Sequence, residues 1–229
     1  MSPTLRIVLG AVPAGPWSIV ADCLKQAGAD ILIATGDGAA LDFPDGWVPD
    51  AVVLLPQDYS VARFDQLDLD IWCAQQETET DQRFALSQRV FQMMASAGGG
   101  AIVHVVDARA LPGATGQGAS MIAAYAAAGL SRGTALDMRE RVASNVVAVS
   151  PNPADMDAFV AFLKHLCGPA GRAISGQMAL IEADRLQLFC QPRPVRIGHS
   201  DGPWSEAALA AQVADWADDL PRLGNGRQQ

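Results

Sequence analysis

Apolar residues in this chain gather in short continuous runs, separated by polar segments rich in glycine and proline. Runs of aliphatic and β-branched residues without polar alternation are typical of parallel strands that are covered on both faces. We therefore expect a buried parallel sheet. The runs expected as strands are 5–9, 29–34, 51–55, 101–106, 146–150 and 175–182.

Segments with helical periodicity alternate with these runs, which is typical of strand–helix–strand units. Helices are expected over 16–27, 69–97, 120–138, 153–168 and 201–220. The alternation predicts an α/β fold with a Rossmann-like, doubly wound parallel sheet. The predicted domain covers residues 1–184, and residues 185–229 form a C-terminal extension made of an arm, a short helix and a frayed tail.

Charge and composition exclude several classes of partner. The chain has 229 residues, is 50% hydrophobic and carries a formal net charge of −9. Nucleic acids and anionic membrane surfaces recruit clustered Lys and Arg, so neither is an expected partner. No signal peptide or membrane-spanning run is recognised. The four cysteines are far apart and are expected to be reduced thiols that form no metal site. The expected location is therefore the cytoplasm.

One stretch carries a family resemblance. Residues 100–138 read GAIVHVVDARALPGATGQGASMIAAYAAAGLSRGTALDM, a strand, a loop and an alanine-rich helix. This stretch resembles the catalytic segment of the short-chain dehydrogenase/reductase family, in which a serine ends the strand and a tyrosine and a lysine follow. With the spacing kept, those places hold Asp107, Ser120 and Ala124. The resemblance implies a hydride-transfer scaffold whose catalytic groups are gone.

The replacements cannot perform the family's chemistry. In the family, the tyrosine donates a proton, the lysine lowers the pKa of that tyrosine and binds ribose, and the serine orients the carbonyl. A serine at 120 is a poor acid, Ala124 carries no charge, and Asp107 opposes a developing oxyanion. Tyr125 is a candidate to replace the family's tyrosine, although helical rotation points it away from that position. His104 is expected to be a core histidine with satisfied hydrogen bonds.

The phosphate-binding turn is also degenerate. The family's three glycines fall on Gly10, on Gly15 if one residue is inserted, and on Trp17. The last glycine lets backbone approach the pyrophosphate, and an indole would fill that space. Pro13 and Pro16 also remove N–H donors from the turn. An alignment without the insertion places alanine and proline on the second and third glycines, which fits no better.

Other cofactor-contacting positions have changed as well. Thr35 stands at the place of the ribose-binding acid, and Asp37 two residues later is its candidate substitute. Leu54 and Leu55 replace the family's paired asparagines after the third strand. Glu79, inside the acidic ETETD, falls on the active-site asparagine, and we expect ETETD to be a solvated face. No cofactor or metal is expected in this chain, with Gly10, Gly15 and Asp37 as the remaining cofactor candidates.

The helices that assemble the family look intact. Family members associate through two long helices, here 71–97 and 120–138, and small side chains let helix backbones approach closely. We therefore expect pairing with an active short-chain dehydrogenase homologue, in a heterodimer or heterotetramer in which that partner uses NAD or NADP. The interface residues expected are Ala123, Ala124, Ala127, Gly129, Phe84 and Phe91.

The C-terminal third bears on the substrate. The family's substrate-covering segment is nearly absent between residue 150 and the next helix. The QPRPVR and GPWSEAALAAQ elements resemble the arm of family members acting on CoA thioesters, which points to a hydroxyacyl-CoA substrate for the partner. Two alternatives stay open: a divergent NAD(P)-dependent oxidoreductase using Asp107 or Tyr125, and a ligand sensor that keeps the pocket without turnover.

Overall fold

A computed structural model describes most of the chain. The described residues are 4–10, 16–35, 41–56, 62–111, 115–138, 141–150, 153–189, 199, 202–203 and 205–216. Residues up to Phe189 form one compact unit, and those from Cys190 form a second. The first unit carries the sheet and the candidate site.

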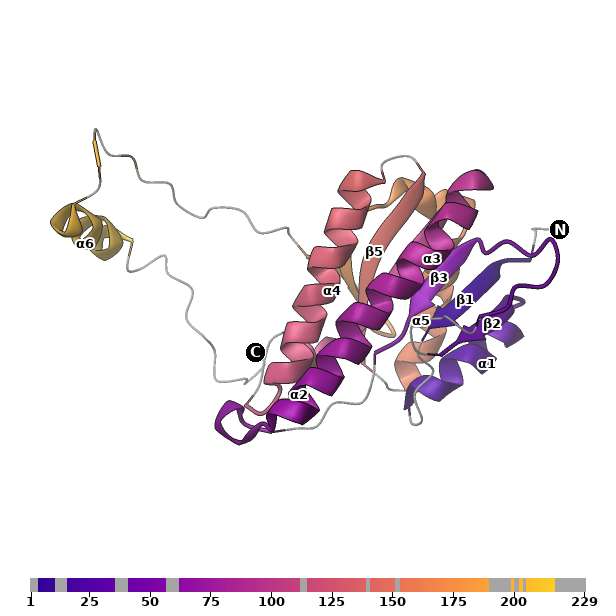
Figure 1. Cartoon of the computed structure of the whole chain (residues 1–229), viewed down its shortest axis with the longest axis horizontal. Coiled ribbons are helices and arrows are strands. Elements are labelled where there is room, and N and C mark those ends of the chain that lie inside the picture. The colour runs from indigo at the N-terminus through magenta and orange to yellow at the C-terminus, as the bar shows by residue number, and fades with distance from the viewer. Residues whose placement is uncertain are drawn as a thin grey trace. The chain divides into compact units, whose positions relative to one another are not determined.

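Seven strands form a single sheet within the described residues of the first unit, in the order β2-β1-β3-β4-β5-β6-β7 (Figure 1). All neighbours are parallel except the last pair, β6 and β7. The prediction of a Rossmann-like, doubly wound α/β fold is confirmed. The strands are β1 Arg6–Gly10, β2 Asp30–Ala34, β3 Ala51–Leu54, β4 Gly100–Asp107, β5 Val142–Val149, β6 Met178–Ile181 and β7 Leu186–Leu188.

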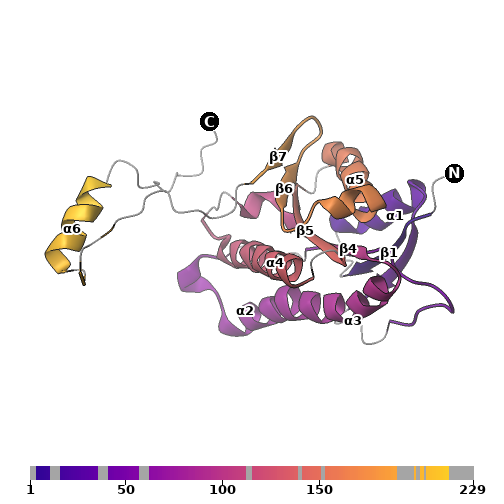
Figure 2. The ribbon, with the colours of Figure 1, turned by 90° about the horizontal axis from the view of Figure 1, so that it is seen from above.

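Helices cover both faces of the sheet. In the view from above, α1 and α5 lie on one side, and α2, α3 and α4 lie on the other (Figure 2). The helices of this unit are α1 Ile19–Gln26, α2 Leu69–Gln76, α3 Gln82–Ser96, α4 Gly118–Asp137 and α5 Pro153–Cys167, and a π-helical segment, Glu77–Asp81, joins α2 to α3.

The two faces have separate cores because alternate residues of each buried strand point to opposite sides. Val103 and Val105 of β4 pack in the cluster under α1 and α5, where Trp17 and Phe159 are the largest fully buried side chains. Ile102 packs in the cluster under α3. The strand runs are therefore apolar on both faces, as expected for a covered parallel sheet.

Two strands differ from the prediction. β5 begins at Val142, four residues earlier than expected, because Ser144 and Asn145 are buried with their hydrogen bonds satisfied. The Asn145 side chain donates to the Ile174 carbonyl at 2.6 Å and accepts from the Gln177 amide at 3.1 Å. β7 is not among the expected strands, and its pairing with β6 extends the sheet beyond residue 184.

The second unit contains one described helix, α6 Glu206–Asp215, which lies inside the predicted 201–220 helix. Ser205 caps it, since its side-chain oxygen accepts from the Ala208 amide at 3.2 Å. None of its residues is buried. No described helix in either unit is long and apolar enough to cross a membrane.

Candidate functional site

The strand order reverses between β1 and β3, and open α/β sheets bind ligands outside the carboxyl ends of their strands at such a point. Gly10, Leu54 and Asp107 end three neighbouring strands at this edge. The candidate site therefore lies along this edge of the sheet.

Asp107 ends β4 and is held by the turn that follows it. Its carboxylate accepts from the Arg109 backbone amide at 2.9 Å and from Arg109 Nε at 3.0 Å. The same two side chains form an ion pair, in which the Asp107 side chain is 12% exposed. A carboxylate engaged in a turn and neutralised by a guanidinium is a structural group. It offers no hydroxyl to orient a carbonyl.

Ser120 and Ala124 lie on the inner side of α4. The Ser120 hydroxyl donates to the Gln117 carbonyl at 3.0 Å, within the first turn of the helix. Ala124 is 2% exposed and packs with Val106 and Val146 on the sheet. The positions that correspond to the family's tyrosine and lysine thus support the helix and its contact with the sheet.

Tyr125 points away from this edge of the sheet. Its side chain is 58% exposed, and its neighbour Ala124 faces the core. Successive residues of a helix differ by about 100° in direction, so a residue next to a core-facing position lies on the flank or the surface. The tyrosine therefore cannot take the family's place at the end of β4.

Helix α3 contributes a buried ion pair that the sequence pattern did not indicate. Arg83 and Glu79 side chains are 4% and 2% exposed, and Arg83 Nη2 lies 2.7 Å from Glu79 Oε2. The prediction that ETETD is a solvated face is corrected for Glu79. The π-helical turn at 77–81 carries this residue inward, and π turns are frequent at functional sites.

Arg83 also joins the ends of two strands. Its Nη1 donates to the Leu54 carbonyl at 3.2 Å, and its Nη2 donates to the Val105 carbonyl at 3.1 Å. β3 and β4 stop pairing at Leu54 and His104, so these carbonyls lie where the ladder ends. The guanidinium satisfies both carbonyls in a place where bulk water does not reach.

His104 of β4 is fully buried, and neither ring nitrogen has a hydrogen-bond partner in the described structure. Burial, together with a smaller contribution from the nearby Arg83 charge, lowers its pKa to about 3. The ring is therefore neutral at physiological pH. The prediction of a core histidine fits this burial, but its expected hydrogen bonds are missing.

Gly10 allows close packing between β1 and α3. A Cβ at this position would lie 2.6 Å from Leu86 Cδ2 and 2.8 Å from Leu54 Cδ2, so a side chain here would require both leucines to shift. Leu86 and Leu54 thus pack directly against Gly10 at the end of β1. Gly15 and Asp37, the other two cofactor candidates, lie outside the described residues.

The rest of the nucleotide region is apolar. Trp17 is 2% exposed, and its indole packs in the core under α1 and α5. Leu54 and Leu55 are buried where the family has asparagines. Among these described residues, the point where the strand order reverses is lined by apolar side chains and not by hydrogen-bond donors for phosphate or ribose.

Among the described residues, no group of three His, Cys, Asp or Glu side chains could hold a metal ion. The described cysteines Cys23, Cys73 and Cys167 are free thiols, and Cys190 lies outside the described residues. Burial, together with a smaller contribution from the Asp50 charge, raises the pKa of Cys167 to about 12. This thiol is therefore inert at neutral pH.

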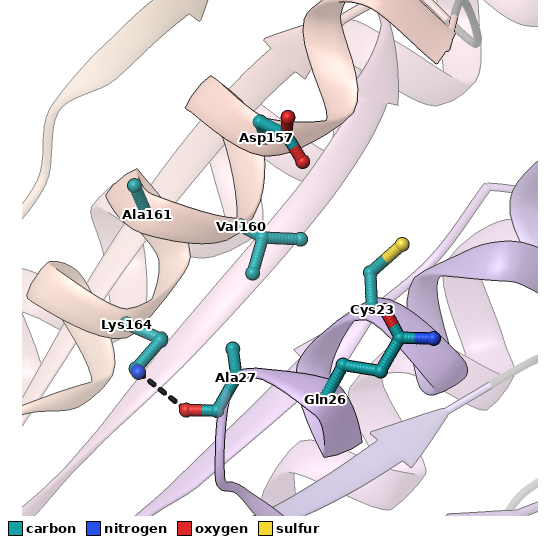
Figure 3. Close-up of a pocket in the computed structure, with 7 residues that line it drawn as sticks. All are labelled: Cys23, Gln26, Ala27, Asp157, Val160, Ala161 and Lys164. Atoms are coloured by element: carbon teal, nitrogen blue, oxygen red, sulfur yellow. Dashed lines mark hydrogen bonds between the residues drawn. The ribbon is translucent and has the colours of Figure 1, made fainter.

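A groove of about 550 Å³ lies on the other face, between α1 and α5. Figure 3 shows Lys164 of α5 reaching toward Ala27 at the end of α1, where its Nζ donates to the carbonyl at 2.5 Å. A lysine at the C-terminus of a helix satisfies a carbonyl that has no intrahelical partner. The contact joins the two helices, which lie on the opposite face of the sheet from α2, α3 and α4 (Figure 2).

The predicted interface residues divide between two faces of the helices. Ala123, Ala124 and Ala127 are 2–3% exposed and packed within the chain, so they offer little surface to a partner. Gly129 is exposed, and a Cβ there would meet no atom within 4 Å.

Phe84 is 50% exposed, whereas Phe91 is partly buried and packs with the cluster under α3. The outer face of the helices is nonetheless apolar. The exposed large hydrophobic side chains of α2, α3 and α4 are Leu69, Ile71, Phe84, Ile122, Tyr125 and Leu136.

Solved structures share this fold. A short chain dehydrogenase from Mycobacterium avium superposes with a TM-score of 0.75 at 17% identity, covering 95% of this chain and 87% of that one. A gluconate 5-dehydrogenase from Burkholderia cenocepacia, in complex with NADP and tartrate, gives 0.67 at 17% identity and covers 78% and 94%. An acetoin dehydrogenase from Enterobacter cloacae gives 0.64 at 17% identity and covers 80% and 96%.

No family model and no curated protein matches the sequence. At these identities the structural likeness shows the fold alone, which is that of short-chain dehydrogenases.

Proposed function

We propose that this chain is a non-catalytic subunit that pairs with an active short-chain dehydrogenase and stabilises it. One observation carries the proposal: all three catalytic positions of the family are used for structure. Asp107 is engaged by Arg109, the Ser120 hydroxyl is engaged by the Gln117 carbonyl, and Ala124 is packed in the core. The fold is that of oxidoreductases, and in the described structure the side chains at these three positions make structural contacts.

The outer surface of α3 and α4 supports the pairing. Phe84 on α3 and Ile122, Tyr125 and Leu136 on α4 are 45–58% exposed. With Gly129, the α4 residues follow a spacing of three, four and seven positions, which places them on one stripe of the helix. A stripe of large apolar side chains around a glycine suits the close approach of a partner helix, so this surface replaces the buried alanines as the proposed interface.

In this proposal the partner holds NAD or NADP and performs the hydride transfer. Its substrate is proposed to be a hydroxyacyl-CoA, because the C-terminal arm resembles that of family members acting on CoA thioesters. The QPRPVR element, residues 191–196, lies outside the described residues, whereas GPWSEAALAAQ, residues 202–212, is described except at position 204. This chain would contribute interface area and would not contribute groups to the reaction.

Co-expression with a tagged active homologue tests the proposal. The two chains should copurify in a stable complex, and Phe84→Asp should abolish the copurification, because a charge would be buried against a partner helix. Asp157→Ala, an exposed position on α5, is the matched control and should leave the yield of complex unchanged. Monomers of both chains in every pairing would contradict the proposal.

The alternative function is a divergent NAD(P)-dependent oxidoreductase. It predicts saturable binding of NADH or NADPH to the isolated chain and turnover that depends on Asp107 or Tyr125. Calorimetric titration of the isolated chain separates the two functions, since a non-catalytic subunit should give no binding heat.

A further inference from the structure

A cavity of about 640 Å³ lies at the amino edge of the sheet, opposite the strand ends that form the candidate site. Arg6 begins β1, Asp30 begins β2, and Asp50 directly precedes β3. Because these strands are parallel, their first residues meet at one edge. Arg172, from the 3-10 helix Pro169–Ala173 after α5, also lines the cavity. Ligand pockets usually measure about 300–1,000 Å³, so this cavity is large enough for a small molecule.

The two carboxylates of the cavity are held in place by neutral groups. Asp30 Oδ2 accepts from the indole Nε1 of Trp47 at 2.6 Å, and Asp50 Oδ2 accepts from the Arg6 backbone amide at 2.9 Å. Among the described residues, no hydrogen bond or ion pair engages the second oxygen of either carboxylate. Each carboxylate therefore keeps one oxygen for a donor from outside the chain.

The two guanidinium groups of the cavity also contact neutral groups. Arg6 Nη1 makes a long contact of 3.5 Å with the Gly46 carbonyl, and Arg172 Nη1 donates to the Gly98 carbonyl at 3.1 Å. Within the described part of the chain, neither arginine forms an ion pair. Two positive and two negative groups thus share one cavity without pairing with one another.

This arrangement selects against ligands that carry a single charge. The two guanidinium groups and two carboxylates sum to zero, so an anion or cation that is attracted by one pair is repelled by the other. A ligand with both charges gains from both pairs, because hydrogen bonds between ionised groups are short and strong. An apolar wall, formed by Val48, Pro49 and Ala97, is available to the rest of the ligand.

We propose that this cavity binds a free α-amino acid with an apolar side chain. The carboxylate of the ligand accepts hydrogen bonds from the guanidinium groups of Arg6 and Arg172. Its ammonium group donates to the second oxygens of Asp30 and Asp50, and its side chain contacts the apolar wall. An α-amino acid is the simplest ligand that combines both charges with an apolar group.

This inference does not rest on the proposed function, because the cavity uses neither the carboxyl ends of the strands nor the outer surface of α3 and α4. Their failures are distinguishable. Arg172→Met should weaken amino-acid binding and leave copurification with the active homologue intact, whereas Phe84→Asp should do the reverse.

Titration of the nitrogen-15-labelled chain with L-leucine, followed by nuclear magnetic resonance, tests the proposal. Saturable shifts are expected in the backbone amide signals of Ala97 and Gly99, which line the cavity. Two analogues are matched controls, since leucinamide lacks the carboxylate and isocaproate lacks the ammonium group. Each should bind at least about tenfold more weakly than L-leucine, because it loses a hydrogen bond between charged groups.

Two variants of the cavity identify the site. Asp30→Asn keeps an acceptor for the Trp47 indole and removes the charge, and Arg172→Met removes one guanidinium group. Each should weaken L-leucine binding at least about tenfold, with the circular dichroism spectrum unchanged. Arg132→Met, at an exposed position on α4, is the matched control and should bind L-leucine as the parent chain does.

Three results would overturn the proposal. The first is a parent chain that shows no saturable shift with L-leucine. The second is equal binding of L-leucine and its two analogues, and the third is binding that survives both cavity variants.

Discussion

At the scale of single residues, the polar groups near the strand ends serve the fold. The guanidinium of Arg83 binds Glu79 and the carbonyls of Leu54 and Val105 in a site closed to water. His104 lies buried beside it without hydrogen bonds. The chain thus holds a buried charge pair and a neutral imidazole near the strand ends, the edge at which open α/β sheets bind ligands.

Replacing Arg83 should destabilise the fold strongly. Arg83→Met leaves the Glu79 carboxylate buried and two strand-end carbonyls without donors, and breaking a buried pair from one side costs about 3–5 kcal/mol. Chemical denaturation followed by circular dichroism measures the loss. Arg63→Met, which breaks an exposed pair with Asp65, should change stability by less than about 0.5 kcal/mol. Equal effects of the two changes would contradict the structural role of Arg83.

His104 should make stability depend on pH. Its pKa is about 3 in the folded chain and 6.5 in the reference state, so the unfolded chain binds more protons between these values. Stability contributed by the neutral ring is complete above about pH 6.5 and falls toward pH 3, at up to about 1.4 kcal/mol per pH unit.

His104→Leu should remove that component of the slope and leave stability at pH 7 equal or higher, because the lost nitrogens had no partners. Urea midpoints measured from pH 7 to pH 4 provide the comparison. His165→Gln, at an exposed position on α5, is the control. A slope that survives His104→Leu would show that other groups carry it.

At the scale of elements, the sequence pattern predicts those strands and helix ends whose formation depends on local sequence. The β-branched runs and the glycines that end helices are enough to place most strands, as at Gly28, whose φ of 87° stops α1. The burial of Glu79 cannot be read from ETETD, because an acidic pentapeptide has the composition of a solvated face. Its direction depends on the π turn, and the pairing of β7 depends on its tertiary contact with β6.

The candidate site likewise has features that local sequence predicts and features that depend on tertiary contacts. The proposed loss of the catalytic groups rests on spacing alone, which places Asp107, Ser120 and Ala124 at the family's positions. Spacing does not reveal which side of α4 faces outward, because hydrophobic and small residues occur all around this helix. Small side chains alone therefore point to the alanines as interface, whereas the structure buries them against β4 and β5.

Substitutions of Gly129 in α4 should stabilise the isolated chain when the new side chain is small and weaken the complex when it is long. A Cβ there meets no atom, so Gly129→Ala should stabilise the isolated chain by about 0.5–1 kcal/mol, the usual gain in an exposed helix. Thermal unfolding of the isolated chain measures the gain. Gly129→Met should weaken the complex with an active homologue, because a long side chain keeps the partner helix away. Tight pairing by Gly129→Met would contradict the proposed interface.

At the scale of the whole molecule, the fold separates three surfaces. The carboxyl edge of the sheet is filled with structural contacts, the outer face of α3 and α4 is apolar, and the amino edge carries a cavity lined by both charges. Under the two proposals, the first surface has lost its reaction, the second provides assembly, and the third binds an amino acid. The acidic net charge of −9 is compatible with these apolar contacts and with the lack of any expected nucleic-acid partner.

The most direct measurement is the number of nicotinamide nucleotides bound by the purified complex of this chain with its active partner. Calorimetric titration with NADH or NADPH should reach saturation at one nucleotide for every two chains. Two nucleotides per pair of chains, or saturable binding by this chain alone, would contradict a non-catalytic role.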